Sequence, residues 1–234
     1  AYTFELSKCF EQAVKERALT VLANIDPVLC EGVATGLGLP VPPATVPFAD
    51  VRPSPALSQL GETWPPDGRV IGIVADETDA RGMEAVRSFR EAVLSAGMVP
   101  LVIAATGGTL DADGEAVTVQ RTFAAARSVE FDALYVAACP APGLDAQGVR
   151  DAKAGHVSTD APLVDPRVVL LLSEAYRHGK AVCATGEGAT ALEAARLPVD
   201  APGVVVGDDA GQVLSELTGL LGAHRVWERF PASL

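Results

Sequence analysis

Between residues 69 and 221, short apolar runs alternate with segments whose apolar residues recur at helical spacing, and no other feature constrains the fold as much. The runs, each read as a buried strand, are 69–75, 98–104, 131–138, 180–185 and 203–207. The segments read as helices are 81–96, 166–177, 187–196 and 212–221. Strands that are apolar on both sides belong in a sheet with both faces covered, as in α/β proteins. We predict an α/β domain with a mostly parallel sheet and helices on both faces.

Two further elements are predicted within this region. The segment 107-GGTLDADGEAVTV-119 is typical of a hairpin that turns at Asp113-Gly114. Residues 122–127 are predicted to form a short helix, and a long polar loop is expected over 140–165.

The first 66 residues differ in character from the rest. Helical spacing of apolar residues predicts a helix over 11–25, and Asp26 followed by Pro27 marks the start of a second helix that Gly36 and Gly38 end. Residues 40–66 contain eight prolines, which exclude helix and favour extended backbone. We therefore predict a short helical segment over 1–39, a Pro-rich linker over 40–66 and a domain over 67–234.

Charge and cysteine content narrow the function. The net charge is −12, from 18 basic and 30 acidic residues, which argues against nucleic acid and anionic membrane surfaces as partners. The apolar run 168-VVLLL-172 is too short to span a bilayer, and no signal peptide is recognised. The four cysteines form no C-x-x-C pair, so no structural zinc site is expected. Few cysteines and no signal point to the cytoplasm.

Loops at the carboxyl ends of the predicted strands are the places to search for a site, because open α/β sheets bind ligands there. A cysteine nucleophile is one hypothesis, with Cys139 and Cys183 as candidates. Cys183 falls inside a predicted strand, where apolar surroundings raise the pKa of a thiol, and Cys139 has no histidine near it in sequence. Buried, inert thiols are the expected outcome.

A nucleotide site is the second hypothesis. Gly186-x-Gly188-x-x-Ala191 follows a strand, opens a helix and fits the dinucleotide-binding fingerprint, and Asp208 ends a later strand near the spacing of a ribose contact. Glu187 would place a negative charge where pyrophosphate binds, so a structural turn is the favoured interpretation.

Acidic residues suggest two more sites. The segment 111-DADGE-115 looks like part of a calcium loop but lacks the third alternating ligand and the terminal glutamate, so a hairpin turn explains it better. Asp79, in 76-DETDA-80, is a candidate general base, although an acid at this position also suits the dipole of the following helix. No residue is assigned as a metal ligand.

Several phrases together resemble the C-terminal portion of a large-subunit haem catalase, the kind that carries an extra flavodoxin-like domain. They are 3-TFELSKC-9, 16-ERALTVLANID-26, 108-GTLDADGEAVTVQRTFAAARSVEFDALYV-136, 174-EAYRHGKAV-182 and 223-AHRVWERFP-231. The resemblance implies that residues 1–39 end the helical region of the catalase core. It also implies that the domain has the DJ-1/PfpI, or class I glutamine-amidotransferase-like, fold.

The same comparison bears on the turn after residue 185. In DJ-1/PfpI proteins a Lys-Pro-x-x-x-x-Cys-His-Gly pattern forms the nucleophile elbow, and laid on 180-KAVCATGEG-188 it puts Gly186 at the cysteine and Glu187 at the histidine. The glycine pair that shapes the oxyanion site is matched by Ala138-Cys139, and the acid after the first strand by Asp79. The resemblance therefore implies a vestigial elbow formed by Gly186, Glu187 and Gly188, with no catalytic residue.

The function that follows is a non-catalytic one. The resemblance implies that haem, its tyrosine ligand, and a distal histidine with an asparagine belong to the core of the parent catalase, which decomposes hydrogen peroxide, while this chain holds no cofactor. It implies as partners the core of the same polypeptide, the homotetramer and unfolded client proteins of a chaperone-like activity. A cysteine enzyme of the amidotransferase class and a nucleotide-binding module are the alternatives.

Overall fold

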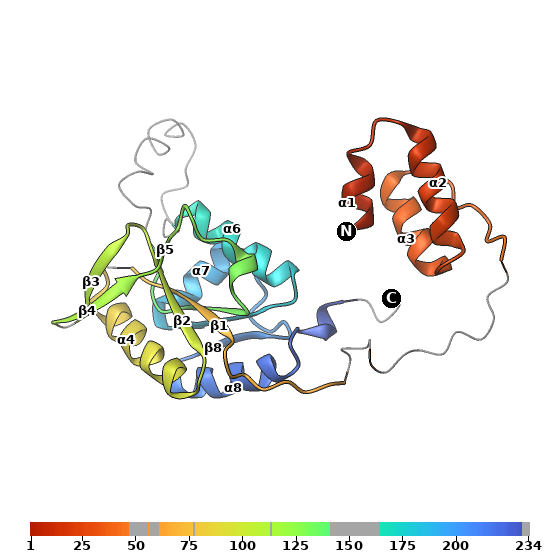
Figure 1. The fold of residues 1–234 in the computed structure, drawn as a ribbon. Helices are drawn as coiled ribbons and strands as arrows, with labels where there is room; N and C mark the ends of the chain where they lie inside the picture. Colours follow the sequence, from red (N-terminus) through yellow and green to blue (C-terminus); the bar gives the residue numbers. More distant parts are fainter. Residues whose placement is uncertain (47–55, 57–60, 77, 113, 141–163, 231–234) are drawn as a thin grey trace. The chain divides into compact units, whose positions relative to one another are not determined.

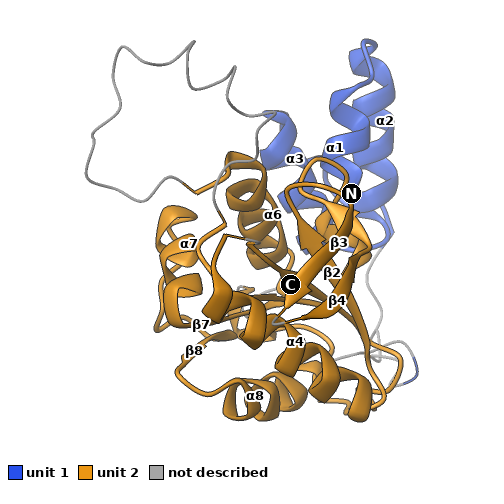
Figure 2. Ribbon diagram, turned by 90° about the vertical axis from the view of Figure 1, so that its left-hand side faces the viewer, with its two compact units in different colours: residues 1–58, 231–234 blue, residues 59–230 orange. Residues whose placement is uncertain are grey.

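The computed structural model describes residues 1–46, 56, 61–76, 78–112, 114–140 and 164–230. The chain divides into two compact units, one of residues 1–58 and 231–234 and one of residues 59–230, which Figure 2 shows in separate colours. Residues 47–55 and 57–60 of the predicted linker, about half of it, lie outside the described ranges.

The first unit contains three helices with a small core of their own. They are α1 (Tyr2–Ser7), α2 (Gln12–Ala23) and α3 (Pro27–Leu37). The Asp26 carboxylate accepts hydrogen bonds from the backbone N–H groups of Val28 and Leu29, which confirms the predicted start of the second helix. Its end is set by Gly38, in the left-handed region at φ +67°, whereas Gly36 lies inside α3.

A six-stranded sheet forms the centre of the second unit, and every neighbouring pair in it is parallel. Its strands are β1 (Val70–Val74), β2 (Val99–Ala104), β5 (Arg121–Thr122), β6 (Ala133–Val136), β7 (Ala181–Thr185) and β8 (Val204–Gly207). They are arranged in the order β5-β2-β1-β6-β7-β8. With the two-residue β5 set aside, this is the strand order of flavodoxin-like sheets.

Helices cover both faces of the sheet, as predicted (Figure 1). On one face, α4 (Ala80–Ser95) and α8 (Ala210–Gly222) pack on the strands together with the hairpin of β3 (Gly108–Ala112) and β4 (Glu115–Val119). The other face is covered by α6 (Pro166–Arg177) and α7 (Ala189–Ala194). Each face has its own apolar core, so both sides of every long strand are enclosed.

One predicted element is wrong. Residues 122–127 do not form a helix, because Thr122 belongs to β5 and the N–H of Phe123 donates to the carbonyl of Ala104, which extends the parallel ladder to β2. A turn follows, and the 3₁₀ helix η2 (Ser128–Glu130) leads into β6. The helix expected over 187–196 is shorter than predicted, since residues 186–188 form a separate 3₁₀ turn, η4, before α7.

Gly188 marks the closest approach between the end of β7 and its neighbour β6. A Cβ atom at this position would overlap the backbone carbonyl of Val136, which cannot move without breaking the sheet. Glycine is thus required here for contact between backbones rather than for a positive φ.

We expect Gly188→Ala to lower the free energy of unfolding by about 1–3 kcal/mol, the usual cost of overpacking a well-packed region. Chemical denaturation followed by circular dichroism measures it. Gly219→Ala is the matched control, because Gly219 lies in α8 with no atom within 4 Å of the added Cβ. That substitution should be neutral or stabilise the helix by about 0.5–1 kcal/mol. Equal effects of the two variants would contradict this account of Gly188.

Candidate functional site

The loops that follow β1, β6 and β7 meet at the carboxyl edge of the sheet. A Cβ added at Gly82, in the first turn of α4, would lie 2.5 Å from the Cβ of Ala138 and 2.9 Å from an Asp79 carboxylate oxygen. The backbone of Gly188 in turn lies against Val136 and Ala137. The described residues of these three loops therefore lie next to one another at the carboxyl edge of the sheet, where open α/β sheets bind ligands.

The turn after β7, which the resemblance predicted to be a vestigial elbow, has a left-handed glycine at its tip. Gly186 has φ +51°, the left-handed conformation that side chains rarely adopt, and it is exposed with no atom within 4 Å of where a Cβ would be. Glu187 is exposed beside it, and Gly188 is buried. The position from which a nucleophile would project is open to solvent but has no side chain.

Cys139 lies in the loop after β6, and its surroundings oppose ionisation of the thiol. Burial raises the pKa of the Cys139 thiol, and the negative charges of Asp76 and Glu187 raise it further. A reactive cysteine needs the opposite, a nearby positive charge or a helix N-terminus that favours the thiolate.

Cys183 is fully enclosed in the sheet, at the centre of β7 between β6 and β8. Burial raises the pKa of its thiol to about 12. The cysteine-enzyme alternative is therefore not favoured for either thiol.

Asp76 and Asp79 of the first loop take structural roles. The Asp79 carboxylate caps α4 by accepting a hydrogen bond from the N–H of Arg81 at 3.0 Å. Asp76 is almost fully buried, and one of its oxygens accepts from both the N–H and the hydroxyl of Thr78, at 2.9 and 2.7 Å. Asp79 therefore serves the helix start that the sequence already suggested for it.

The nucleotide and calcium patterns also fall on structural turns. Ala191 is buried and packs α7 onto the sheet, while Asp208 is exposed. The Asp111 carboxylate accepts from the N–H of Gly114 at 2.7 Å and closes the predicted hairpin, of which Asp113 lies outside the described residues.

Two buried polar contacts were not predicted. The ammonium of Lys180, at the start of β7, donates to the carbonyls of Ser128 and Phe131, the latter at 2.6 Å, and burial lowers the pKa of this lysine. The hydroxyls of Tyr135 and Thr185 share a hydrogen bond of 2.6 Å inside the sheet. The available signal for the first contact was a lysine directly before an apolar strand. The second contact had no local signal, because it joins residues 50 positions apart.

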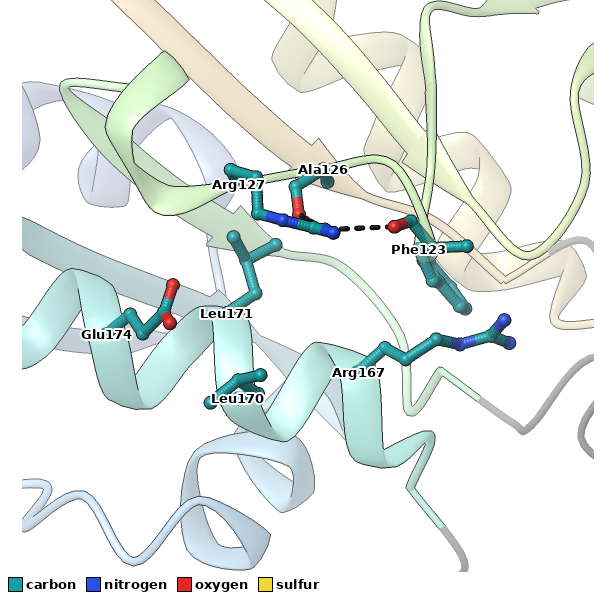
Figure 3. A pocket seen from close by; sticks show the side chains of 8 residues that line it. Phe123, Ala126, Arg127, Arg167, Leu170, Leu171 and Glu174 are labelled. Carbon is teal, nitrogen blue, oxygen red and sulfur yellow. Dashed lines mark hydrogen bonds between the residues drawn. The ribbon is translucent and has the colours of Figure 1, made fainter. Parts of the chain in front are cut away.

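A pocket of about 230 Å³ lies between α6 and the turn after β5 (Figure 3). Leu170 and Leu171 of α6 line it, and Arg127 donates from Nη1 to the carbonyls of Ala124 and Ala126. Arg167 is held by the buried Asp165 through Nε and Nη2, at 3.0 and 2.7 Å. The two arginines that line the pocket therefore stabilise the surrounding turns through these hydrogen bonds.

The described part of the chain was also searched for metal ligands and membrane spans. It contains no group of three or more His, Cys, Asp or Glu side chains placed to hold a metal ion. None of its helices is long and apolar enough to cross a membrane.

Comparison with known proteins gives a consistent family. The sequence profile described as the C-terminal domain found in long catalases matches residues 67–231. Catalase HPII of Pseudomonas aeruginosa is 33% identical over 235 residues, which cover 100% of this chain and 31% of that protein. Catalase-B of Dictyostelium discoideum is 29% identical over 236 residues, covering 98% and 31%. Catalase-2 of Bacillus subtilis is 25% identical over 233 residues, covering 98% and 31%. The chain thus spans about a third of the length of these relatives.

We expect Cys183 to remain unmodified when the native protein is treated with iodoacetamide at pH 8. Burial raises the pKa of this thiol to about 12, so only about one thiol in ten thousand is ionised at pH 8, and the side chain is fully enclosed. Cys139 should react more slowly than free cysteine, because its pKa is raised. Peptide mass spectrometry with time reads out each site, and fast labelling of either thiol would restore the cysteine-enzyme alternative.

Gly186→Cys supplies the positive control. The new thiol would project into open space from the elbow and should be labelled at a rate near that of free cysteine, at a strain cost of about 1–3 kcal/mol for a side chain at positive φ. A Gly186→Cys thiol as inert as Cys183 would contradict the elbow geometry.

Proposed function

The chain belongs to the family of C-terminal domains found in long catalases, and we propose that it serves its parent enzyme as a non-catalytic, structural domain. The observation that carries this proposal is Gly186: the elbow keeps the conformation that presents a nucleophile and has no side chain to present. Glu187 nearby adds a negative charge, and Cys139 adds a thiol whose pKa is raised. Neither side chain replaces the missing nucleophile.

The domain has, in this proposal, the DJ-1/PfpI or amidotransferase-like fold with its catalytic residues altered. The flavodoxin-like strand order and the elbow directly after β7 support it. Residues 1–39 are then the helical end of the catalase core, residues 40–66 the linker and residues 67–234 the appended domain.

The surface of the first unit supports its attachment to a larger body. Its exposed apolar side chains include Tyr2, Phe4, Phe10 and Ile25, and Phe10 is fully exposed. Three short helices with a core of six buried residues leave these groups uncovered. In the parent these side chains would be buried against the catalase core. The parent itself would be a homotetramer in the cytoplasm.

Peroxide chemistry is assigned to the core of the parent, which would bind haem and decompose hydrogen peroxide to water and oxygen. Two described side chains of types that ligate haem iron are already engaged or enclosed. Among the side chains that ligate haem iron in proteins, Tyr135 is stacked on Phe89 and hydrogen-bonded to Thr185, and Cys183 is enclosed within the sheet. No step of the reaction is therefore assigned to this chain.

Deleting the segment that matches residues 67–231 from the full-length parent tests the structural role. The rate of peroxide decomposition per haem should stay within about twofold, because no catalytic group is lost. The half-life of activity at raised temperature should fall several-fold, because the loss of a packed domain speeds irreversible unfolding. An unchanged half-life together with an unchanged tetramer on size-exclusion chromatography would refute the structural role, and a lost rate per haem would refute the non-catalytic one.

A chaperone-like action is the second part of the proposal, and the apolar residues of the first unit would carry it in the separate chain, where they are uncovered. At equimolar amounts the chain should reduce the light scattering of a heated client such as citrate synthase. A variant with Phe4→Ser and Phe10→Ser should lose this effect while the α/β unit, whose cores contain neither residue, keeps its melting temperature. No reduction by the unaltered chain would end this part of the proposal.

A further inference from the structure

A group of cationic side chains gathers at the amino ends of β1, β6 and β7, on the edge of the sheet opposite the elbow. Arg69 precedes β1, Asp132 precedes β6, Lys180 precedes β7, and His224 with Arg225 follows the end of α8. We call these five residues the amino-edge cluster. It holds three permanent cations and one carboxylate, in a chain whose net charge is −12.

Two guanidinium groups of this cluster converge on one imidazole. Nη1 of Arg69 lies 3.0 Å from Nδ1 of His224, and Nη1 of Arg225 lies 3.5 Å from the same nitrogen. The two arginines are therefore near neighbours. Both donate toward Nδ1, which must be the unprotonated nitrogen of a neutral ring to accept.

The single carboxylate of the cluster is already engaged. Asp132 accepts from Nη1 of Arg69 at 3.2 Å through one oxygen and from the N–H of Val70 at 2.9 Å through the other. Lys180 is directed away, toward the carbonyls of Ser128 and Phe131. The charge of Arg225 is therefore left without a paired acid among the described residues.

Both arginines have N–H groups that donate to none of the described residues. Each uses Nη1 for its hydrogen bonds, Arg225 also bonding the carbonyl of His224 at 2.8 Å, and among the described residues no acceptor is found for Nε or Nη2 of either side chain. These nitrogens are not among the buried polar atoms that lack a partner, so they reach solvent. Arginine side chains with free N–H pairs side by side match the oxygens of carboxylate and phosphate groups.

The electrostatics agree with an excess of positive charge. Burial lowers the pKa of His224, and the charges of Arg225 and Arg69 lower it further. Burial also lowers the pKa of Arg225, with Arg69 adding to the effect and Asp132 opposing it. The two arginine charges share the single carboxylate of Asp132, and a further anion placed between them would relieve the repulsion that remains.

We propose that Arg69 and Arg225, oriented by His224, form a binding site for an oxyanion, either a phosphate or a carboxylate. The anion would accept hydrogen bonds from the free N–H groups of both arginines at the amino edge of the sheet. Nothing in the proposed structural role of the domain requires this site, and its failure would leave that role untouched.

The test follows the imidazole of His224 by proton NMR in the 234-residue chain. The ionic strength is held constant with chloride, because screening alone alters charge interactions. Sodium phosphate and sodium acetate are added in separate titrations, which distinguish a phosphate from a carboxylate ligand. A His224→Gln variant identifies the resonance among the three histidines.

An anion in the site should raise the pKa of His224 toward its ordinary value, because it offsets the two arginine charges. The effect should saturate with phosphate or with acetate, and the apparent affinity should fall about tenfold or more in Arg225→Gln, as expected for the loss of one charge-assisted hydrogen bond. Arg225→Lys keeps the positive charge but loses the planar pair of N–H donors of the guanidinium, so it should also weaken anion binding.

Arg90→Gln is the matched control, since Arg90 lies in α4 outside the cluster and should bind like the unaltered chain. Circular dichroism confirms that each variant is folded. The proposal is overturned if neither anion moves the pKa of His224 beyond the chloride control. It is equally overturned if Arg225→Gln and Arg225→Lys both leave the saturating response intact.

Discussion

The rest of this structure depends on a parallel sheet that is buried on both faces. Every residue of β6 and β7 is buried, so a polar side chain within these strands must find its partner inside the sheet. Tyr135 and Thr185 meet this condition by bonding one another. Other buried polar residues of the sheet, such as Asp76 and Lys180, lie at the two edges where the strands end and begin.

The two edges carry charges of opposite sign, for a reason that lies in the helices. In each strand-to-helix unit the helix runs back antiparallel to its strand, so the positive helix N-termini lie at the carboxyl edge of the sheet. Asp79, Asp165 and Asp209 cap α4, α6 and α8 there. The negative C-terminus of α8 lies at the other edge, beside the cations of the amino-edge cluster. The acids at the elbow and the arginines at the amino edge are thus complementary to the helix dipoles. The acids at the elbow also disfavour a thiolate or a phosphate there, because both are negatively charged.

Patterns that depend on neighbouring residues were sufficient to predict most of the fold. The bounds of α6 follow from the Asp165-Pro166 start and its apolar stripe, and β7 follows from an uninterrupted apolar run. The helix predicted at 122–127 was wrong because a hydrogen bond from Phe123 to Ala104, on a strand distant in sequence, overrides local helix propensity.

The position of the candidate site could be predicted from the sequence, but the residues that surround it could not. The loops that meet at the elbow could be chosen from the strand ends alone. The acids that raise the pKa of Cys139 come from two different loops, and Arg69 meets His224 from 155 positions away. No periodicity in a single sequence reports such distances.

Gly186 has a consequence for how this domain can change over generations. A functional elbow holds a side chain at positive φ and carries backbone strain of about 1–3 kcal/mol as a condition of its reactivity. Glycine relieves that strain, and every substitution at this position brings it back. A lineage with glycine here would lose stability at the first step toward a nucleophile and gain activity only after the acidic neighbours had also changed. The glycine therefore opposes the return of a nucleophile at this position.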